Sequence, residues 1–380
     1  MWINRRKIRK ERMKVSCTQE NLAKGLGIVS RSVGTRTTLP VLNNILLKTE
    51  KGGLKLSATD LEIGISTWIG AKVDMDGAVT IPAKLLLDYI TTNNDKKISF
   101  ELKNLNIHFE SEHYKANIKG IEASEFPLIP TVKRKTEIEI PTKDLEKAIS
   151  KVIIASALDE SRPVLAGIYI TGDQGKLKIV ATDSYRLAEQ TINLTKKISS
   201  AVSFVVPQRT MAEVLRILPQ ANDTVTIYPG ENQVEFILGE TALVSRLIEG
   251  TFPDYEQIIP KKSKTQIKVS AVEFNNAIKM ASLFARESAN NIKLNTSPPS
   301  KISVLATSPH LGDNISEVSG KVTGESLEIA FNAKFILDVL QVINDPEITL
   351  EMSDNLAPGM LRGSNDPNYL YVIMPLRIDE

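Results

Sequence analysis

The chain has 380 residues, of which 42% are apolar and 24% charged, a composition typical of a globular protein with a substantial core. No apolar run reaches the ~20 residues that a membrane helix needs, and the basic N-terminus lacks the apolar segment of a secretory signal. The net charge is +2, but residues 1–12 carry six basic side chains and one acidic, so the remainder is acidic. Such a body is not a general polyanion binder, because that affinity grows with the phosphates neutralised. The single cysteine, Cys17, excludes an internal disulfide and favours a reducing cytoplasm.

A basic extension precedes the first regular pattern of the chain. Residues 1–12 show no apolar periodicity, and we expect them to be disordered. Met13 is followed directly by the strand-like run KVSCT, so we place the start of the folded chain there. An inert tail and a functional arm both remain open as explanations of the extension.

One arrangement of elements occurs three times from Met13 onward. Each copy opens with a short strand and an amphipathic helix, at residues 14–31, 138–156 and 267–284. A predicted β-hairpin follows in each copy, and then a second helix and further strands. Self-similarity of this kind indicates repeated structural modules.

The hairpins of the first two copies have the same spacing. Val41 and Thr59 are eighteen residues apart, as are Val164 and Thr182, and a fainter third copy spans 291–308. Each hairpin consists of two strand-like runs joined by a turn, for example GIYITGD and KLKIVATD in the second copy. The shared spacing predicts the same hairpin in each repeat.

The second helices follow strands that end at Pro82, Pro207 and Asn332, and these three positions are 125 residues apart. Apolar residues recur at i, i+3 and i+4 in each helix, which predicts one apolar face against a sheet. A basic residue and, four residues later, an acidic residue take the same position each time: Lys84 and Asp88, Arg209 and Glu213, Lys334 and Asp338. Solvated ion pairs between the two explain this pattern, and so does a shared basic surface.

Polar linkers separate the copies at residues 133–137 and 261–265. We therefore predict three α+β domains, at 13–132, 137–261 and 265–380, each with two amphipathic helices packed on antiparallel sheets. The helices are too few, and the strands too consecutive, for a doubly wound parallel sheet.

Patterns of catalytic or metal-binding residues are missing from the sequence. It contains three histidines, with no HExxH, CxxC or phosphate-binding glycine loop. Asp60 and Asp183 end a repeated ATD, and we expect them to cap turns at strand ends, as Ser308 can in the third copy. Cys17 lies in a strand pattern and should be buried. We therefore predict no enzyme, no catalytic residue, no metal and no cofactor.

Four segments carry a resemblance to a known family. They are TLPVLNNILL (38–47), ATDSYRLA (181–188), TFPDYEQIIP (251–260) and YLYVIMPLRI (369–378). Together with the threefold α+β repeat, they make the chain resemble the bacterial DNA sliding clamps, the beta subunits of DNA polymerase III. The likeness extends from Met13 to Glu380.

The resemblance implies a ring, in which a head-to-tail homodimer closes around double-stranded DNA without sequence specificity. It implies a non-catalytic processivity factor for DNA replication. The implied partners are the catalytic subunit of DNA polymerase III, the clamp loader, and other polymerases and repair proteins with clamp-binding peptides. A cytoplasmic, nucleoid-associated location is implied, with no membrane contact and no cofactor.

The resemblance also assigns residues to three surfaces. A hydrophobic groove for partner peptides would comprise Leu165, Thr182, Ser184, Tyr185, Arg186, Leu187, Pro253, Ile258, Val372, Met374, Pro375 and Leu376. The DNA-facing residues would be Arg36, Lys84, Arg209 and Lys334. The two subunits would meet at Tyr114 and Ile118 of one chain and Leu283 and Phe284 of the other.

The chain departs from the wording of the family in three places. Ser184-Tyr185 stands where many relatives have Gly-His, Glu256-Gln257 replaces a frequent basic residue, and Arg162–Val164 lacks an aromatic pair that some relatives present to DNA. These differences concern the peptide preference and the DNA contacts of one loop.

Two other functions remain open from the sequence. A monomeric scaffold could bind peptides without enclosing DNA, and a hydrolase could use Asp60 or Asp183. A dimer near twice the chain mass of 41.9 kDa would exclude the first. The hydrolase predicts a turnover that is lost when either aspartate is replaced by asparagine.

Overall fold

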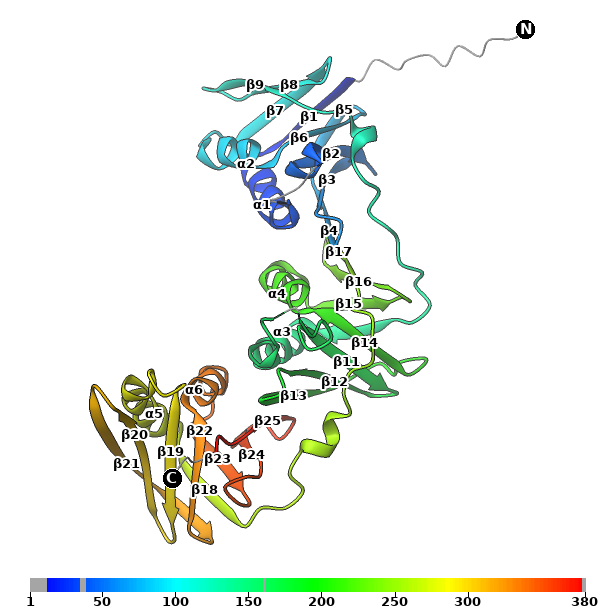
Figure 1. Cartoon of the computed structure of the whole chain (residues 1–380). Helices are drawn as coiled ribbons and strands as arrows, with labels where there is room; N and C mark the ends of the chain where they lie inside the picture. The colour runs from blue at the N-terminus through cyan, green and yellow to red at the C-terminus, as the bar shows by residue number, and fades with distance from the viewer. Residues whose placement is uncertain (1–11, 35–38, 160, 378–380) are drawn as a thin grey trace. The chain divides into compact units, whose positions relative to one another are not determined.

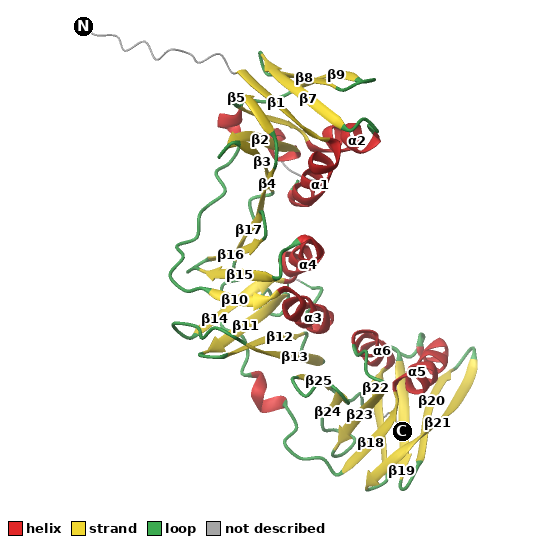
Figure 2. Ribbon diagram, turned by 180° about the vertical axis from the view of Figure 1, so that it is seen from behind, coloured by secondary structure: helices red, strands yellow, loops and turns green. Residues whose placement is uncertain are grey.

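The computed structural model describes residues 12–34, 39–159 and 161–377 (Figure 1). They form two compact units. The first contains the chain up to Thr142 together with Arg216–Arg246, and the second contains Lys143–Leu215 and the chain from Leu247 onward. Both units consist of antiparallel sheets with a few helices (Figure 2), which confirms the predicted α+β class.

Two sheets build the first unit. The five-stranded sheet has the order β5-β1-β7-β8-β9, and the eight-stranded sheet has the order β10-β15-β16-β17-β4-β3-β2-β6. Their strands are β1 (Arg12–Thr18), β2 (Asn44–Glu50), β3 (Gly53–Thr59), β4 (Ile63–Ile69), β5 (Lys72–Met75), β6 (Ala78–Pro82), β7 (Lys97–Lys103), β8 (Asn106–Glu110), β9 (Lys115–Lys119), β10 (Ile138–Pro141), β15 (Thr224–Pro229), β16 (Gln233–Leu238) and β17 (Thr241–Arg246).

One sheet of twelve strands runs through the second unit, in the order β14-β11-β12-β13-β25-β24-β23-β18-β21-β20-β19-β22. Its strands are β11 (Gly167–Asp173), β12 (Lys176–Thr182), β13 (Arg186–Asn193), β14 (Val202–Pro207), β18 (Thr265–Ser270), β19 (Asn291–Ser297), β20 (Lys301–Ser308), β21 (Gly312–Gly324), β22 (Leu327–Asn332), β23 (Glu347–Met352), β24 (Gly359–Gly363) and β25 (Tyr369–Ile373). The predicted hairpin of the second repeat is β11 and β12.

Six α-helices occur in the described ranges: α1 (Gln19–Val29), α2 (Ala83–Thr92), α3 (Thr142–Val152), α4 (Gln208–Ile217), α5 (Ala271–Ala285) and α6 (Ala333–Val342). The second helix of each repeat starts directly after Pro82, Pro207 or Asn332, as predicted. Side-chain caps fix some of these starts; the Asn332 side chain, for example, accepts a hydrogen bond from the N–H of Lys334 at 2.9 Å. Within these ranges, no helix combines the length and apolar character needed to cross a lipid bilayer.

The second helices bury the apolar face that their sequence predicts. The large apolar residues buried on this face include Leu86 and Ile90 on α2, Met211 and Val214 on α4, and Ile336 and Val339 on α6. Burial of each such side chain contributes about 1.5–3 kcal/mol, so this face holds each helix on its sheet. The opposite face keeps the polar residues of the repeat.

The turns after β3, β12 and β20 are capped as predicted. Asp60 and Asp183 each accept hydrogen bonds from the backbone N–H groups two and three residues later, at distances of 2.8–3.1 Å. The Ser308 hydroxyl oxygen accepts the corresponding pair at 3.0–3.3 Å. The repeated ATD is therefore a structural turn, with Ser able to replace Asp because either side chain supplies an acceptor oxygen.

The repeats are joined by strand pairing across their boundaries. β4 of the first repeat pairs with β17 of the second, with Thr67 opposite Thr241. β13 of the second repeat pairs with β25 of the third, with Leu187 opposite Val372. Backbone hydrogen bonds therefore continue each sheet from one repeat into the next, and strands of the middle repeat occur in both compact units.

A tether holds the turn between β8 and β9. His113 Nδ1 and Asp95 Oδ1 are 2.7 Å apart, and the backbone N–H of His113 donates to the other Asp95 oxygen at 2.8 Å. The hydrogen bond to His113 lowers the pKa of Asp95 to about 2, and the hydrogen bond to Asp95 raises the pKa of His113. Glu112 and Tyr89 are the other titratable groups whose charge couples to this pair.

We predict that replacing His113 with Gln weakens the tether only at mildly acidic pH. Because the pKa of His113 is raised, its contribution to the stability of the tether is complete below the ordinary pKa near ~6.5. This contribution is lost as the pH rises through the folded-state pKa. Because the pKa of Asp95 is lowered, its contribution to the stability of the tether is complete above the ordinary pKa near ~3.9. This contribution is lost as the pH falls through the folded-state pKa. Amide hydrogen exchange at Ser111 and Tyr114 should therefore be faster in the variant at pH ~5.5 and nearly equal to wild type at pH ~9. An equal loss of protection at both pH values would contradict the prediction.

Candidate functional site

The junction between β13 and β25 forms an apolar surface with a buried floor. Leu187 and Val372 lie opposite each other there. Both belong to a buried cluster whose other members are Val180, Val205, Phe252 and Tyr255. The rings of Tyr169 and Phe252 stack on each other at its side, with centroids 4.6 Å apart. Two of the predicted groove residues are thus part of the core below this surface, which we call the junction surface.

Other predicted groove residues form the exposed part of the junction surface. The Tyr185 side chain is 63% exposed, and the backbone N–H of Met374 donates a hydrogen bond to Tyr185 O at 2.8 Å. Pro253 and Ile258 are exposed; Pro253 directly follows Phe252 of the buried cluster, and Ile258 comes three residues after Tyr255. Met374, Pro375 and Leu376 are half-buried. Leu165 and Thr182 are buried; the Thr182 hydroxyl donates to the carbonyl oxygen of Arg186 at 2.7 Å. The predicted residues are therefore divided between the floor and the rim.

The turn that presents Tyr185 has an unusual backbone. Ser184 has a φ of 78°, in the left-handed region, where a residue with a side chain costs about 1–2 kcal/mol. Glycine would adopt this conformation without that cost, because it has no Cβ atom. The Arg162 guanidinium donates to the Ser184 hydroxyl at 3.1 Å, which gives the serine side chain a partner at the surface.

Arg186 directs its side chain away from the exposed rim and toward α6. Its Nε lies 3.0 Å from Asp183 Oδ2, and its Nη1 lies 2.5 Å from Asp338 Oδ2. The guanidinium also stacks over the Phe335 ring, 4.3 Å from the centroid. Of the predicted groove residues, Arg186 is the one whose side chain is committed to a neighbouring helix.

The junction between β4 and β17 has the same backbone hydrogen bonding as the junction between β13 and β25, but its outer side chains differ. The N–H of Arg246 donates to Glu62 O at 3.0 Å, as Met374 does to Tyr185. The side chains of Glu62 and Arg246 form an exposed ion pair at 3.4 Å. The first junction is therefore charged where the second one is apolar.

The predicted DNA-facing residues lie at the start of the second helices. Lys84, Arg209 and Lys334 are each the second residue of α2, α4 or α6 and are exposed. Arg36 lies outside the described residues. Lys24 on α1 and Lys279 on α5 are also exposed. They were not predicted, because they do not share a position in the repeat.

The i, i+4 ion-pair interpretation of the second helices is wrong for α2 and α6. Lys84 and Lys334 form no ion pair within the described ranges, and Asp338 is paired with Arg186 instead. On α4, Glu213 is buried and Arg209 is exposed. A buried arginine that is also bonded to Asp183 is a better partner for Asp338 than an exposed lysine, because it is already held in place.

The predicted subunit contacts lie on an edge strand and on α5. β9 is the last strand of the five-stranded sheet, and Tyr114, just before it, is exposed. Ile118 points into the core. Leu283 is exposed on α5 and Phe284 is half-buried.

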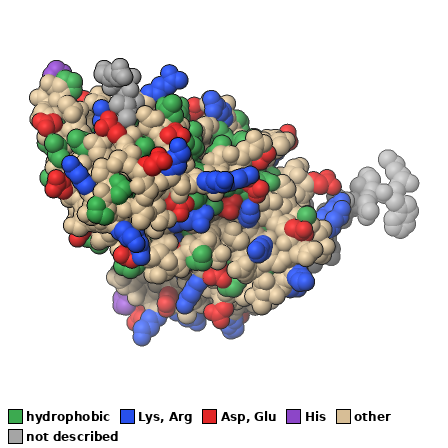
Figure 3. Space-filling model, turned by 90° about the horizontal axis from the view of Figure 1, so that it is seen from below, with side chains coloured by type: hydrophobic (Ala, Val, Ile, Leu, Met, Phe, Trp, Pro, Cys, Tyr) green, Lys and Arg blue, Asp and Glu red, His purple; other side chains and the backbone are tan. Residues whose placement is uncertain are grey.

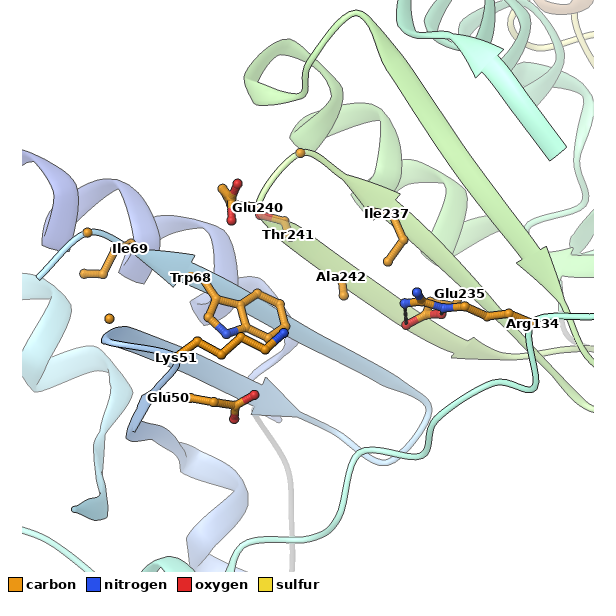
Figure 4. A pocket seen from close by; sticks show the side chains of 13 residues that line it. Glu50, Lys51, Trp68, Ile69, Arg134, Glu235, Ile237, Glu240, Thr241 and Ala242 are labelled. Carbon is orange, nitrogen blue, oxygen red and sulfur yellow. Dashed lines mark hydrogen bonds and ion pairs between the residues drawn. The ribbon is translucent and has the colours of Figure 1, made fainter. Parts of the chain in front are cut away.

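A cavity of about 460 Å³ lies on the first unit (Figure 4). Arg134 and Glu235 in its wall form an ion pair at 3.0 Å, and Lys55 Nζ lies 4.4 Å from the centroid of the neighbouring Trp68 ring. Its lining contains no histidine, cysteine or serine. The cavity therefore lacks the side chains of a Ser–His or Cys–His pair.

Two other chemical groups have structural explanations. Cys17 is buried, and burial raises the pKa of its thiol to about 12, so it is held as the unreactive thiol. Asp95, Glu112 and His113 bring three potential metal ligands together. Asp95 and His113 are already hydrogen-bonded to each other as the tether described above.

The surface charge is mixed on the face drawn in Figure 3. Basic and acidic side chains are interspersed there, and hydrophobic side chains form small separate patches. Such a face has no large field of one sign. Contacts with nucleic acid therefore depend on where particular cations lie.

Models of three protein domains together match almost the whole chain. The N-terminal domain of the DNA polymerase III beta subunit matches residues 13–130, its central domain residues 139–254, and its C-terminal domain residues 256–377. The three matches follow one another in the order of the repeats. Residues 1–12 lie outside all of them.

Curated relatives carry the same description. The chain is 30% identical to the beta sliding clamp of Bacillus subtilis over 376 residues, covering 96% of this chain and 100% of the relative. It is 31% identical to the beta sliding clamp of Caulobacter vibrioides over 373 residues, with the same coverage.

Solved structures of such clamps have the same fold. The sliding clamp of Bacillus subtilis superposes with a TM-score of 0.93 at 29% identity, covering 97% of this chain and 100% of that one. A clamp of Pseudomonas aeruginosa bound to griselimycin gives a TM-score of 0.92 at 26% identity, covering 96% and 100%. The threefold repeat, the strand pairing between repeats and these matches agree, and the chain belongs to the family of bacterial beta sliding clamps, the beta subunits of DNA polymerase III.

Proposed function

We propose that two copies of this chain close head to tail into a ring around double-stranded DNA and tether DNA polymerase III to its template. In this function the chain is a non-catalytic accessory subunit without a cofactor. Its domains would span residues 13–132, 137–261 and 265–380. It would act in the cytoplasm, at the nucleoid.

The observation that carries the proposed ring is a pair of strand edges, one in the third repeat and one in the first, that could form a third junction between two copies. In both existing junctions, the strand after the capped turn pairs with the last strand of the next repeat. In the third repeat the strand after the turn is β21, and in the first repeat the last strand is β9. Residues 312–319 of β21 pair with β20 on one side only, and β9 pairs only with β8, within the described ranges. Pairing β21 of one copy with β9 of another would repeat the internal junction twice and close a dimer.

Exposed apolar side chains accompany these open edges. Ile315 on β21 is 62% exposed, and Leu283 and Met280 on α5 are exposed beside it. Tyr114 is exposed at the start of β9. An edge strand with apolar neighbours is a place where chains associate, because both the backbone groups and the apolar surface gain partners.

The proposed contact with DNA depends on cations at the helix starts. Lys84, Arg209 and Lys334 occur once per repeat, so a ring of two chains would present six of them, with Lys24 and Lys279 in addition. Such contacts neutralise phosphates and read no bases, which suits a protein that slides.

The proposed partner site is the junction surface. The exposed Tyr185 and Ile258 and the half-buried Met374 supply apolar groups above the buried floor, and methionine adapts its shape to different ligands. The charged pair at the first junction makes that junction a poor alternative for an apolar peptide. The occupants would be short peptides of the polymerase catalytic subunit, the clamp loader, other polymerases and repair proteins.

We predict that Ile315→Asp combined with Leu283→Asp converts the dimer to monomers. A carboxylate at each position would be desolvated by the opposing edge, which costs several kcal/mol without a partner. Light scattering should report about twice 41.9 kDa for wild type and the single-chain mass for the variant. Leu356→Asp is the control, because Leu356 is equally exposed in the same repeat but lies away from β21. A monomeric wild type would favour the peptide-binding scaffold instead.

We predict that charge reversal of Lys84, Arg209 and Lys334 to Glu weakens retention on circular DNA after loading. Each lost phosphate contact should also reduce the slope of log affinity against log salt by about 0.9. The control reverses Lys72, Lys176 and Lys301, three exposed lysines on strands. Equal effects of the two triple variants would remove the helix starts from the DNA surface.

We predict that Met374→Ala combined with Ile258→Ala weakens binding of a polymerase-derived peptide about tenfold or more, as measured by fluorescence anisotropy. Two apolar contacts of ~1 kcal/mol each account for that loss. Light scattering should still find the dimer. Val272→Ala, which truncates an exposed apolar side chain on α5, should leave the affinity unchanged. Unchanged affinity in the double variant would mean that the peptide binds elsewhere.

A further inference from the structure

The turn from Asp183 to Arg186 reaches two surfaces of the second unit. Tyr185 is exposed on the junction surface, and its carbonyl oxygen accepts a hydrogen bond from the N–H of Met374. The next residue, Arg186, has a side chain that is only 8% exposed and extends to α6. Any movement of the turn therefore changes both the rim of the junction surface and the contact with α6.

The bonds of Arg186 make this connection rigid. One edge of the guanidinium binds Asp183 within the turn and another nitrogen binds Asp338 on α6, while its face lies on Phe335. Charge-assisted bonds of this kind are among the strongest side-chain interactions, and the planar guanidinium loses little conformational freedom when it forms them. A lysine could keep the charge but could not make the same set of contacts.

A second strand holds the same turn of α6. The Tyr371 hydroxyl on β25 donates to the backbone oxygen of Phe335 at 2.9 Å, and Tyr371 is fully buried next to Val372. β13, β25 and α6 are thus bound together directly behind the junction surface. Arg186 is the member of this group that also belongs to the exposed turn.

The equivalent places in the other repeats do not carry a charge. Ile63 and Leu311 are the residues whose N–H groups bond to Asp60 and Ser308, as that of Arg186 bonds to Asp183. Ile63 is buried at the first junction by simple packing. A buried arginine is more costly than a buried isoleucine, because the charge loses its water. The fold alone therefore does not require an arginine at this place.

We propose that Arg186 is a positioning residue for partner binding: through Asp338 it holds the Asp183–Tyr185 turn in the conformation that receives the peptide. The left-handed backbone of Ser184 needs such support, because it is unfavourable by itself. The peptide then touches Tyr185 and Met374, and Arg186 stays behind them. This inference depends on the proposed role of the junction surface.

The test measures binding of a polymerase-derived peptide to the full-length chain by fluorescence anisotropy. Asp338→Asn removes the carboxylate charge behind the surface and should weaken binding about tenfold, with the dimer mass unchanged. Asp88→Asn is the matched control, since Asp88 has the same position on α2 and forms no ion pair with an arginine of the described ranges; it should have no effect. Arg186→Lys should also weaken binding. In an Arg186→Ile background, Asp338→Asn should cause no further loss, because the bond it breaks is already absent.

Five results distinguish the possibilities. Weaker binding with Asp338→Asn alone, and none added in the Arg186→Ile background, supports the proposal. Equal affinity of wild type and Asp338→Asn overturns it, as does an equal loss with Asp88→Asn. Additive losses in the combined variant would mean that the two residues act separately, which also overturns it. A wild type that binds no peptide would instead refute the proposed partner site itself.

Discussion

Antiparallel pairing between strands of successive repeats is the constraint on which the rest of this structure depends. Backbone hydrogen bonds between β4 and β17, and between β13 and β25, set where each repeat ends and how its neighbour continues the sheet. Such bonds do not require particular side chains. The outer side chains of the two junctions can therefore differ. They are charged at the junction of β4 with β17 and apolar at the junction of β13 with β25.

Local patterns were enough to predict the elements of each repeat. The starts of α2, α4 and α6, the hairpin of β11 and β12, and the capping by Asp60 and Ser308 depend on residues a few positions apart. The pairing of β4 with β17 joins residues 174 positions apart, such as Thr67 and Thr241. No periodicity in the sequence specifies that register, because it is selected by the packing of whole repeats.

The candidate site was predicted unevenly for the same reason. The resemblance named Leu187, Val372 and Met374 together, although it could not separate floor from rim. It also placed Arg186 with the residues that line the groove, whereas its side chain contacts Asp338, 152 positions away. An ion pair between Lys334 and Asp338, four residues apart on one helix, was one of two explanations that the sequence left open. Long-range burial of Arg186 outweighs that weak local preference.

The difference between the two junctions explains why an apolar surface remains open at only one of them. At the first junction, Ile129, shortly before the linker, packs on the backbone at Gly64, where a Cβ atom would lie 2.8 Å from it. At the second junction the sheet carries Leu187, and Phe252 and Tyr255 pack around it as a floor. The rim there is Tyr185 and Met374, where the first junction has the Glu62–Arg246 ion pair. An apolar peptide would have to desolvate that ion pair at the first junction, whereas at the second it would cover apolar groups that already lie in water.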